Sequence, residues 1–83
     1  MGKHESTLDA IFATPTRANI RWADIESLFR HLGADISEGN GSRVRVALND
    51  LVATFHRPHP RPETGKRTVE SVRDFLERAG VNP

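Results

Sequence analysis

The chain has 83 residues, of which 36% are hydrophobic and 28% are charged, and its formal net charge at pH 7 is +1. This length predicts a single domain over residues 1–83 with one modest core, and the absence of cysteine excludes disulfides and thiolate metal sites. No apolar run approaches the roughly 20 residues of a membrane span, and no signal-peptide segment opens the chain, so we expect a cytoplasmic protein with no membrane partner.

Two helices are predicted in the first part of the chain. Residues 6–13 form a short helix capped by Ser6, and a polar connector follows it. A second helix follows residues 20–22 and ends at Gly33, a residue type that suits the left-handed stop position. The apolar stripes have helical spacing: Leu8, Ile11 and Phe12 in the first helix, and Ile25, Leu28, Phe29 and Leu32 in the second. Trp22 and Phe29 are therefore predicted to lie in the core rather than to stack on a ligand.

A hairpin is predicted in the middle of the chain. A short strand over residues 34–38 and a turn at Gly39-Asn40-Gly41 precede it, and Ser42 opens its first strand, which alternates polar and apolar residues. Asn49-Asp50 suits a two-residue hairpin loop, because both residue types tolerate positive φ. A loop of this length fixes the register of the two strands.

This register divides the side chains of the hairpin between two faces. The apolar face is predicted to pair Val44 with Phe55, Val46 with Ala53, and Leu48 with Leu51. The other face is predicted to pair Arg43 with His56, Arg45 with Thr54, and Ala47 with Val52. The hairpin would therefore place two arginines and a histidine on a face that the core does not use.

The last part of the chain is predicted as a loop and a helix. Residues 57–66 hold Pro58, Pro60 and Pro62 at alternate positions, which predicts a stiff loop rather than a strand. A final helix is predicted over residues 68–79, with Thr68 as its N-cap. The economical fold is α+β, with a three-stranded antiparallel sheet covered by helices on one face. It resembles the α-β-β-β-α double-stranded RNA-binding fold with an extra N-terminal helix.

Positive charge gathers on the hairpin and on the loop after it. Residues 43–67 carry six basic residues against two acidic ones, a net charge of +4, whereas the segments before and after them are net negative. Such a patch attracts phosphates, although a solvated loop rich in arginine would give the same count. The candidate phosphate-binding residues are Ser42, Arg43, Arg45, Arg57, Arg61, Lys66 and Arg67.

The order of several short motifs resembles that of the HicA toxin family. The motifs are Leu32-Gly33 at a helix end, Gly41-Ser42 opening a strand, Arg57-Pro58-His59-Pro60 after the hairpin, and the helix from Thr68 to Ala79 followed by Gly80-Val81. The resemblance covers about residues 20–81. It leaves residues 1–19 as an N-terminal extension with its own short helix.

The resemblance implies the toxin of a type II toxin–antitoxin system. Such a toxin is an endoribonuclease that binds and cleaves mRNA, and a HicB-like antitoxin neutralises it by covering its active face. Family members carry their catalytic histidine just after the Gly-Ser, where this chain has Arg43 and Val44. Either the chain has lost catalysis and remains an RNA-binding or antitoxin-binding module, or another histidine carries the chemistry.

Two histidines are candidates for that chemistry. Cleavage of RNA without a metal ion requires proton transfer, which suits histidine, and a cation beside the phosphate, which suits arginine. The hypothesis assigns proton transfer to His56 and His59, and the scissile phosphate to Arg43 and Arg45. The alternative places both histidines in solvent without a role. A metal site at the two histidines is not favoured, because no carboxylate or thiolate lies at ligand spacing, and no cofactor is expected. A pure protein-interaction domain is the third class of function.

Overall fold

The computed structural model describes residues 2–83. Its helices are α1 (Lys3–Ile11), α2 (Trp22–His31) and α3 (Lys66–Arg78). Its strands are β1 (Ile20–Arg21), β2 (Asp35–Glu38), β3 (Arg43–Leu48), β4 (Leu51–His56) and β5 (Glu63–Thr64). No helix within residues 2–83 combines the length and the apolar character needed to cross a bilayer.

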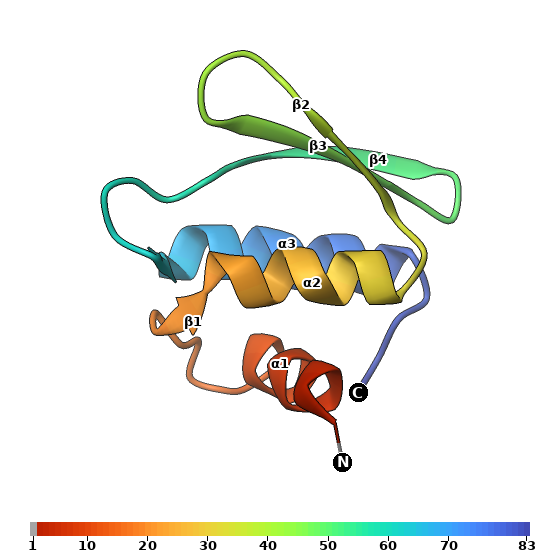
Figure 1. Ribbon diagram of the computed structural model, residues 1–83. Helices are drawn as coiled ribbons and strands as arrows, with labels where there is room; N and C mark the ends of the chain where they lie inside the picture. The colour runs from red at the N-terminus through yellow and green to blue at the C-terminus, as the bar shows by residue number, and fades with distance from the viewer. Residues whose placement is uncertain (1) are drawn as a thin grey trace.

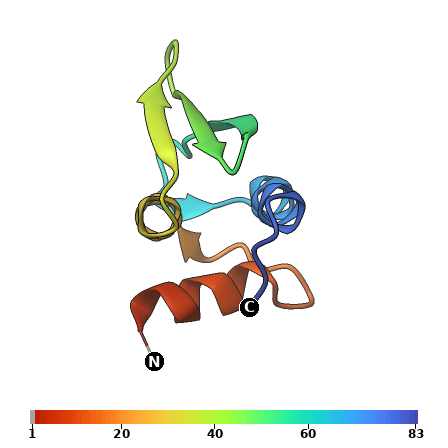
Figure 2. The ribbon, with the colours of Figure 1, turned by 90° about the vertical axis from the view of Figure 1, so that its right-hand side faces the viewer.

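The elements form three layers (Figures 1 and 2). The antiparallel sheet β2-β3-β4 lies on one side of α2 and α3, and α1 lies on the other side of these two helices. The predicted α+β fold, with α-β-β-β-α order and an additional N-terminal helix, is therefore confirmed. The buried apolar residues that join the layers are Ile11, Ile20, Trp22, Ile25, Leu28, Phe29, Val44, Val46, Leu48, Phe55, Val69, Val72, Phe75 and Leu76.

The hairpin has the predicted register along its whole length. Asn49 and Asp50 both have positive φ, 49° and 67°, as a tight two-residue loop requires. Arg43 lies opposite His56, and the pairing continues through to Leu48 opposite Leu51. The apolar face is packed against the helices, whereas the other face is exposed at every position except the half-buried Ala47. We call this exposed side of β3 and β4 the outer face.

Both terminal helices start earlier than predicted. α1 begins at Lys3 and not at Ser6, because the Glu5 carboxylate accepts a hydrogen bond from the Gly2 N–H at 3.1 Å. α3 begins at Lys66, so its N-cap is Gly65 and not Thr68. The Val69 N–H donates to the Gly65 carbonyl at 3.0 Å, which closes the first turn ahead of the predicted start.

The proline-rich segment also differs from the predicted loop, because its end forms a strand. Ile20 and Arg21 of β1 pair antiparallel with Thr64 and Glu63 of β5. Pro62 has no N–H to donate, but its carbonyl accepts a hydrogen bond from the Trp22 N–H at 3.0 Å. The pairing joins residues more than 40 positions apart, and it ties the start of α2 to the start of α3.

The N-terminal helix is tied to the rest of the fold by charged side chains. Arg73 of α3 donates to the carbonyls of Ile11 and Ala13 at 2.9 and 3.2 Å, at the end of α1. At the other end of the helix, Lys3 forms an ion pair with Asp24 of α2 at 3.1 Å. Together with the buried Ile11, these contacts fix α1 beneath α2 and α3.

Candidate nucleic-acid interface

The outer face of the hairpin carries the predicted group of basic residues. Arg43 begins β3 and His56 ends β4, so they are cross-strand neighbours at the same end of the hairpin, a position in which Cβ atoms lie about 5 Å apart. Arg45 lies two residues further along β3, opposite Thr54. All four side chains are exposed, and no ion pair engages Arg43 or Arg45 within residues 2–83. Two free cations and an imidazole therefore share one surface.

A third basic residue, from α3, lines a hollow together with His56. His56 and Arg67 line the same hollow, together with Thr54, Thr68 and Ser71. Arg67 occupies the first turn of α3, so the early start of this helix places a basic side chain beside the end of β4. The sequence grouped Arg67 with the basic loop, and it gave no sign that this residue and His56 would share a hollow.

The remaining predicted residues lie around this site. Ser42 is exposed just before β3, and its carbonyl accepts a hydrogen bond from the Arg57 N–H at 2.9 Å. His59 and Arg61 are exposed in the loop after β4, and Lys66 is exposed at the start of α3. No hydrogen bond or ring stacking joins His59 to His56 in the part of the chain that the structure describes. Nor do three or more ligating side chains in this part come together as a metal site.

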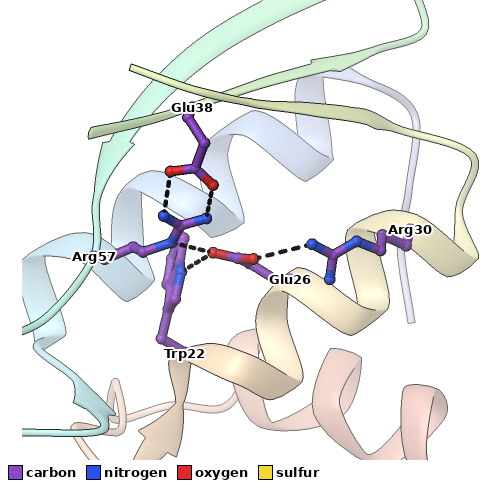
Figure 3. Close-up of polar contacts among 5 residues, drawn as sticks. All are labelled: Trp22, Glu26, Arg30, Glu38 and Arg57. Carbon is purple, nitrogen blue, oxygen red and sulfur yellow. Dashed lines mark hydrogen bonds and ion pairs between the residues drawn. The ribbon is translucent and has the colours of Figure 1, made fainter. Parts of the chain in front are cut away.

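Arg57 is the predicted phosphate ligand that the structure places differently. Its guanidinium forms a two-point ion pair with Glu38 of β2, at 2.6 and 2.7 Å, and its Nε donates to Glu26 of α2 at 2.7 Å (Figure 3). Arg57 is therefore saturated by two carboxylates and does not belong to the free cations of the outer face. The reason is the alternation of β4, because Arg57 follows Phe55 by two positions and turns toward the helices.

Two further residues complete this group, which we call the Arg57 cluster: Trp22, Glu26, Arg30, Glu38 and Arg57. Glu26 accepts hydrogen bonds from the Trp22 Nε1–H and from Arg30, the latter at 3.3 Å (Figure 3). The Glu26 side chain is only 10% exposed, whereas that of Glu38 is 68% exposed. The cluster closes the end of the layered core, between the sheet and α2.

The charges of this cluster stabilise one another. Burial raises the pKa of Glu26. Hydrogen bonds from Arg57 and Trp22 and the positive charges of Arg57 and Arg30 lower it, and together they outweigh burial, so the pKa lies below its ordinary value. The hydrogen bond from Arg57 likewise lowers the pKa of Glu38. In turn, hydrogen bonds to Glu38 and Glu26 raise the pKa of Arg57. Both carboxylates are therefore ionised at neutral pH.

Sequence reasoning missed Glu26 and Glu38 as partners of Arg57. A signal for Glu38 was present, because the register of β2 against β3 places it opposite Val44, on the inner face. Likewise Glu26 lies four residues after Trp22, on the same side of α2. The sequence predicted a strand beside β3 but not the register of β2 against β3, and without that register neither signal could be read.

A comparison with models of protein families identifies the family of this chain. A family model described as "HicA toxin of bacterial toxin-antitoxin" matches residues 22–81, well over half of the chain. The chain therefore belongs to the HicA toxin family, as its motifs predicted, and is the toxin of a toxin–antitoxin pair. Helix α1 and strand β1 precede the matched residues. Neither the curated proteins nor the solved structures gave a significant match.

Proposed function

We propose that this HicA-family toxin is an endoribonuclease that binds and cleaves mRNA in the cytoplasm, and that a HicB-like antitoxin neutralises it. The observation that carries the proposal is the position of His56, which is exposed beside Arg43 and shares a hollow with Arg67. A proton-transfer group thereby lies between a cation of the outer face, Arg43, and a cation of α3, Arg67.

The chemistry follows from these residue types. His56 would accept the proton of the ribose 2′-hydroxyl or supply one to the leaving 5′-oxygen, and His59 is the candidate for the second of these tasks. Arg43 and Arg45 would hold the scissile phosphate, where negative charge builds up during the attack. This scheme assigns no step to a metal ion.

Further basic and polar residues would hold the RNA backbone around that phosphate. Arg67 lines the same hollow as His56, Ser42 directly precedes Arg43, and Arg61 and Lys66 are exposed between β4 and the first turn of α3. We leave Arg57 out of this set, because displacing its two carboxylates would leave Glu26 buried without its cation.

A second function is supported by the residues after Gly41-Ser42. Arg43 and Val44 occupy the positions at which the resemblance places the family's catalytic histidine. A chain without that histidine could bind RNA, or bind only the antitoxin, and cleave nothing. Binding to RNA that weakens with salt, without cleavage, would identify this second function.

The deciding experiment compares His56→Ala with the wild-type chain in cleavage of a purified mRNA in the presence of EDTA. Loss of a proton-transfer residue is expected to lower the cleavage rate by about 100-fold or more. The matched control is His31→Ala, which removes an exposed histidine at the end of α2, away from the outer face. A rate that His56→Ala leaves unchanged would refute the assignment, and no cleavage by the wild-type chain would favour the second function.

A further inference from the structure

The edge of the sheet at β4 has unpaired backbone groups. β4 is an outer strand of the sheet β2-β3-β4, and the Arg57 N–H donates across to Ser42 at 2.9 Å. Every second residue before Arg57 also faces β3, because hydrogen-bonding direction alternates along a strand. The N–H and C=O groups of Val52, Thr54 and His56 therefore point away from the sheet, and within residues 2–83 they have no backbone partner.

A trough runs along this free edge. One hollow is lined by Leu51–Phe55 and by α3 residues from Glu70 to Arg78, and the hollow beside His56 shares Thr54, Phe55 and Ser71 with it. The two hollows are therefore continuous along β4. Helix α3 lies below this edge of the sheet (Figure 2) and forms the floor of the trough. The trough has the length of β4, six residues or about 20 Å, which fits one added strand.

The side chains of the trough differ between its two ends. Val52 lies near one end and is 54% exposed, the only large apolar side chain within residues 2–83 that is mainly exposed. His56 and Arg67 line the other end, where the basic outer face begins. On the floor between them, Asp74 is already paired with Arg78 at 3.1 Å. An occupant that matches the edge therefore needs an apolar residue at one end and a carboxylate at the other.

We propose that an extended segment of the antitoxin binds in this trough as a fourth strand of the sheet, hydrogen-bonded to Val52, Thr54 and His56. The segment carries an apolar residue over Val52 and, four positions away, a carboxylate beside His56 and Arg67, because side chains two and four residues apart share a face of a strand. This inference rests on the proposed function, which supplies the antitoxin as partner. The bound strand would cover His56 and so block the site it shares with Arg67.

The test uses the whole chain and the protein encoded by the reading frame beside its gene. Thr54→Pro removes the outward N–H and leaves the bonds to β3 in place, since proline is tolerated at a strand edge. We expect it to weaken binding of that protein about tenfold. Thr54→Ala, which keeps the N–H, is the matched control and is expected to bind within about twofold of wild type. Equal affinities of the two variants would overturn the inference.

Hydrogen exchange on the wild-type chain supplies a measurement that needs no variant. On binding, the amides of Val52, Thr54 and His56 are expected to slow by about tenfold or more, because they gain partners. Those of Ala53 and Phe55 already bond to β3. An antitoxin that binds without this protection would refute strand addition, although RNA cleavage would still support the proposed function.

Two other outcomes are distinguishable. Protection by a short RNA and not by the protein encoded beside the gene would assign the trough to nucleic acid. If the protein encoded beside the gene does not bind the chain at all, both proposals are contradicted.

Discussion

Three arginines of the same hairpin region have opposite surroundings. Arg43 and Arg45 are exposed on the outer face and form no ion pair within residues 2–83, whereas Arg57 lies at the inner end of the sheet between Glu26 and Glu38. Arg45 belongs to β3, and Arg57 directly follows β4. Their side chains lie on opposite sides of the sheet. The side of the sheet on which an arginine side chain lies therefore decides its role. On the outer face the cation is available to a phosphate, and on the inner side it closes the core.

The two regions also differ in what a substitution should disturb. Removing a group from the inner end leaves buried partners unpaired, which lowers the free energy of unfolding. Removing one from the outer face leaves the fold intact and changes what the surface can bind.

The largest effect is expected from Phe55→Ala on the inner side of β4. The Phe55 ring is 4% exposed, and its centroid lies 5.8 Å from those of Phe29 and Phe75. Truncation is expected to lower the free energy of unfolding by about 3–5 kcal/mol, measured by urea denaturation. Thr54→Ala, next to it but on the outer face, should change this free energy by less than about 0.5 kcal/mol. Similar losses for both variants would show that the two faces are not distinct.

Glu26→Ala should have the next largest effect, because it removes the carboxylate at the centre of the Arg57 cluster. The Arg57 Nε and the Trp22 Nε1–H would lose their acceptor, at an expected cost of about 2 kcal/mol in the free energy of unfolding. The control is Arg30→Ala, which removes a partner of the same carboxylate whose own side chain is 62% exposed. That control should cost no more than about 0.5 kcal/mol. A Glu26→Ala variant as stable as the control would contradict a structural role for the cluster.

Replacing the outer arginines should change RNA binding and not stability. Arg43→Gln and Arg45→Gln are each expected to weaken RNA binding by up to about tenfold, and to reduce the slope of log affinity against log salt by about 1. Arg17→Gln serves as the control, since Arg17 is an exposed arginine in the connector after α1. If the control reduces the salt slope as much as the outer variants do, RNA does not select the outer face.

The smallest effect is expected from acid on the Arg57 cluster. The folded-state pKa of Glu26 lies below its ordinary value of 4.5, so near that pH the unfolded chain binds more protons than the folded chain. The stability that Glu26 contributes is therefore complete above about pH 5 and is lost as the pH falls through the folded pKa. The stability difference between wild type and Glu26→Gln should shrink as urea denaturation is repeated from pH 7 to pH 3. A constant difference would contradict this linkage.

Local rules predicted the part of the fold that carries the outer face. The Asn49-Asp50 loop fixes the register between β3 and β4, so the neighbours Arg43 and His56 followed from the sequence. The pairing of β1 with β5 could not follow, because it joins distant segments, one of them rich in proline. The partners of Arg57 depend on β2, α2 and β4 together, so a count of basic residues placed this arginine with the free ones.

The attachment of α1 by Arg73 has a consequence for how this toxin can vary. Arg73 holds the main-chain oxygens of Ile11 and Ala13, and every amino acid supplies such an oxygen. A change of side chain at Ala13 would therefore keep this acceptor, whereas a change at Thr16 would remove the hydroxyl that accepts from Arg73 at 3.0 Å. The main-chain part of the anchor depends on the side chain of one α3 residue, Arg73, which lies within the residues matched by the family model.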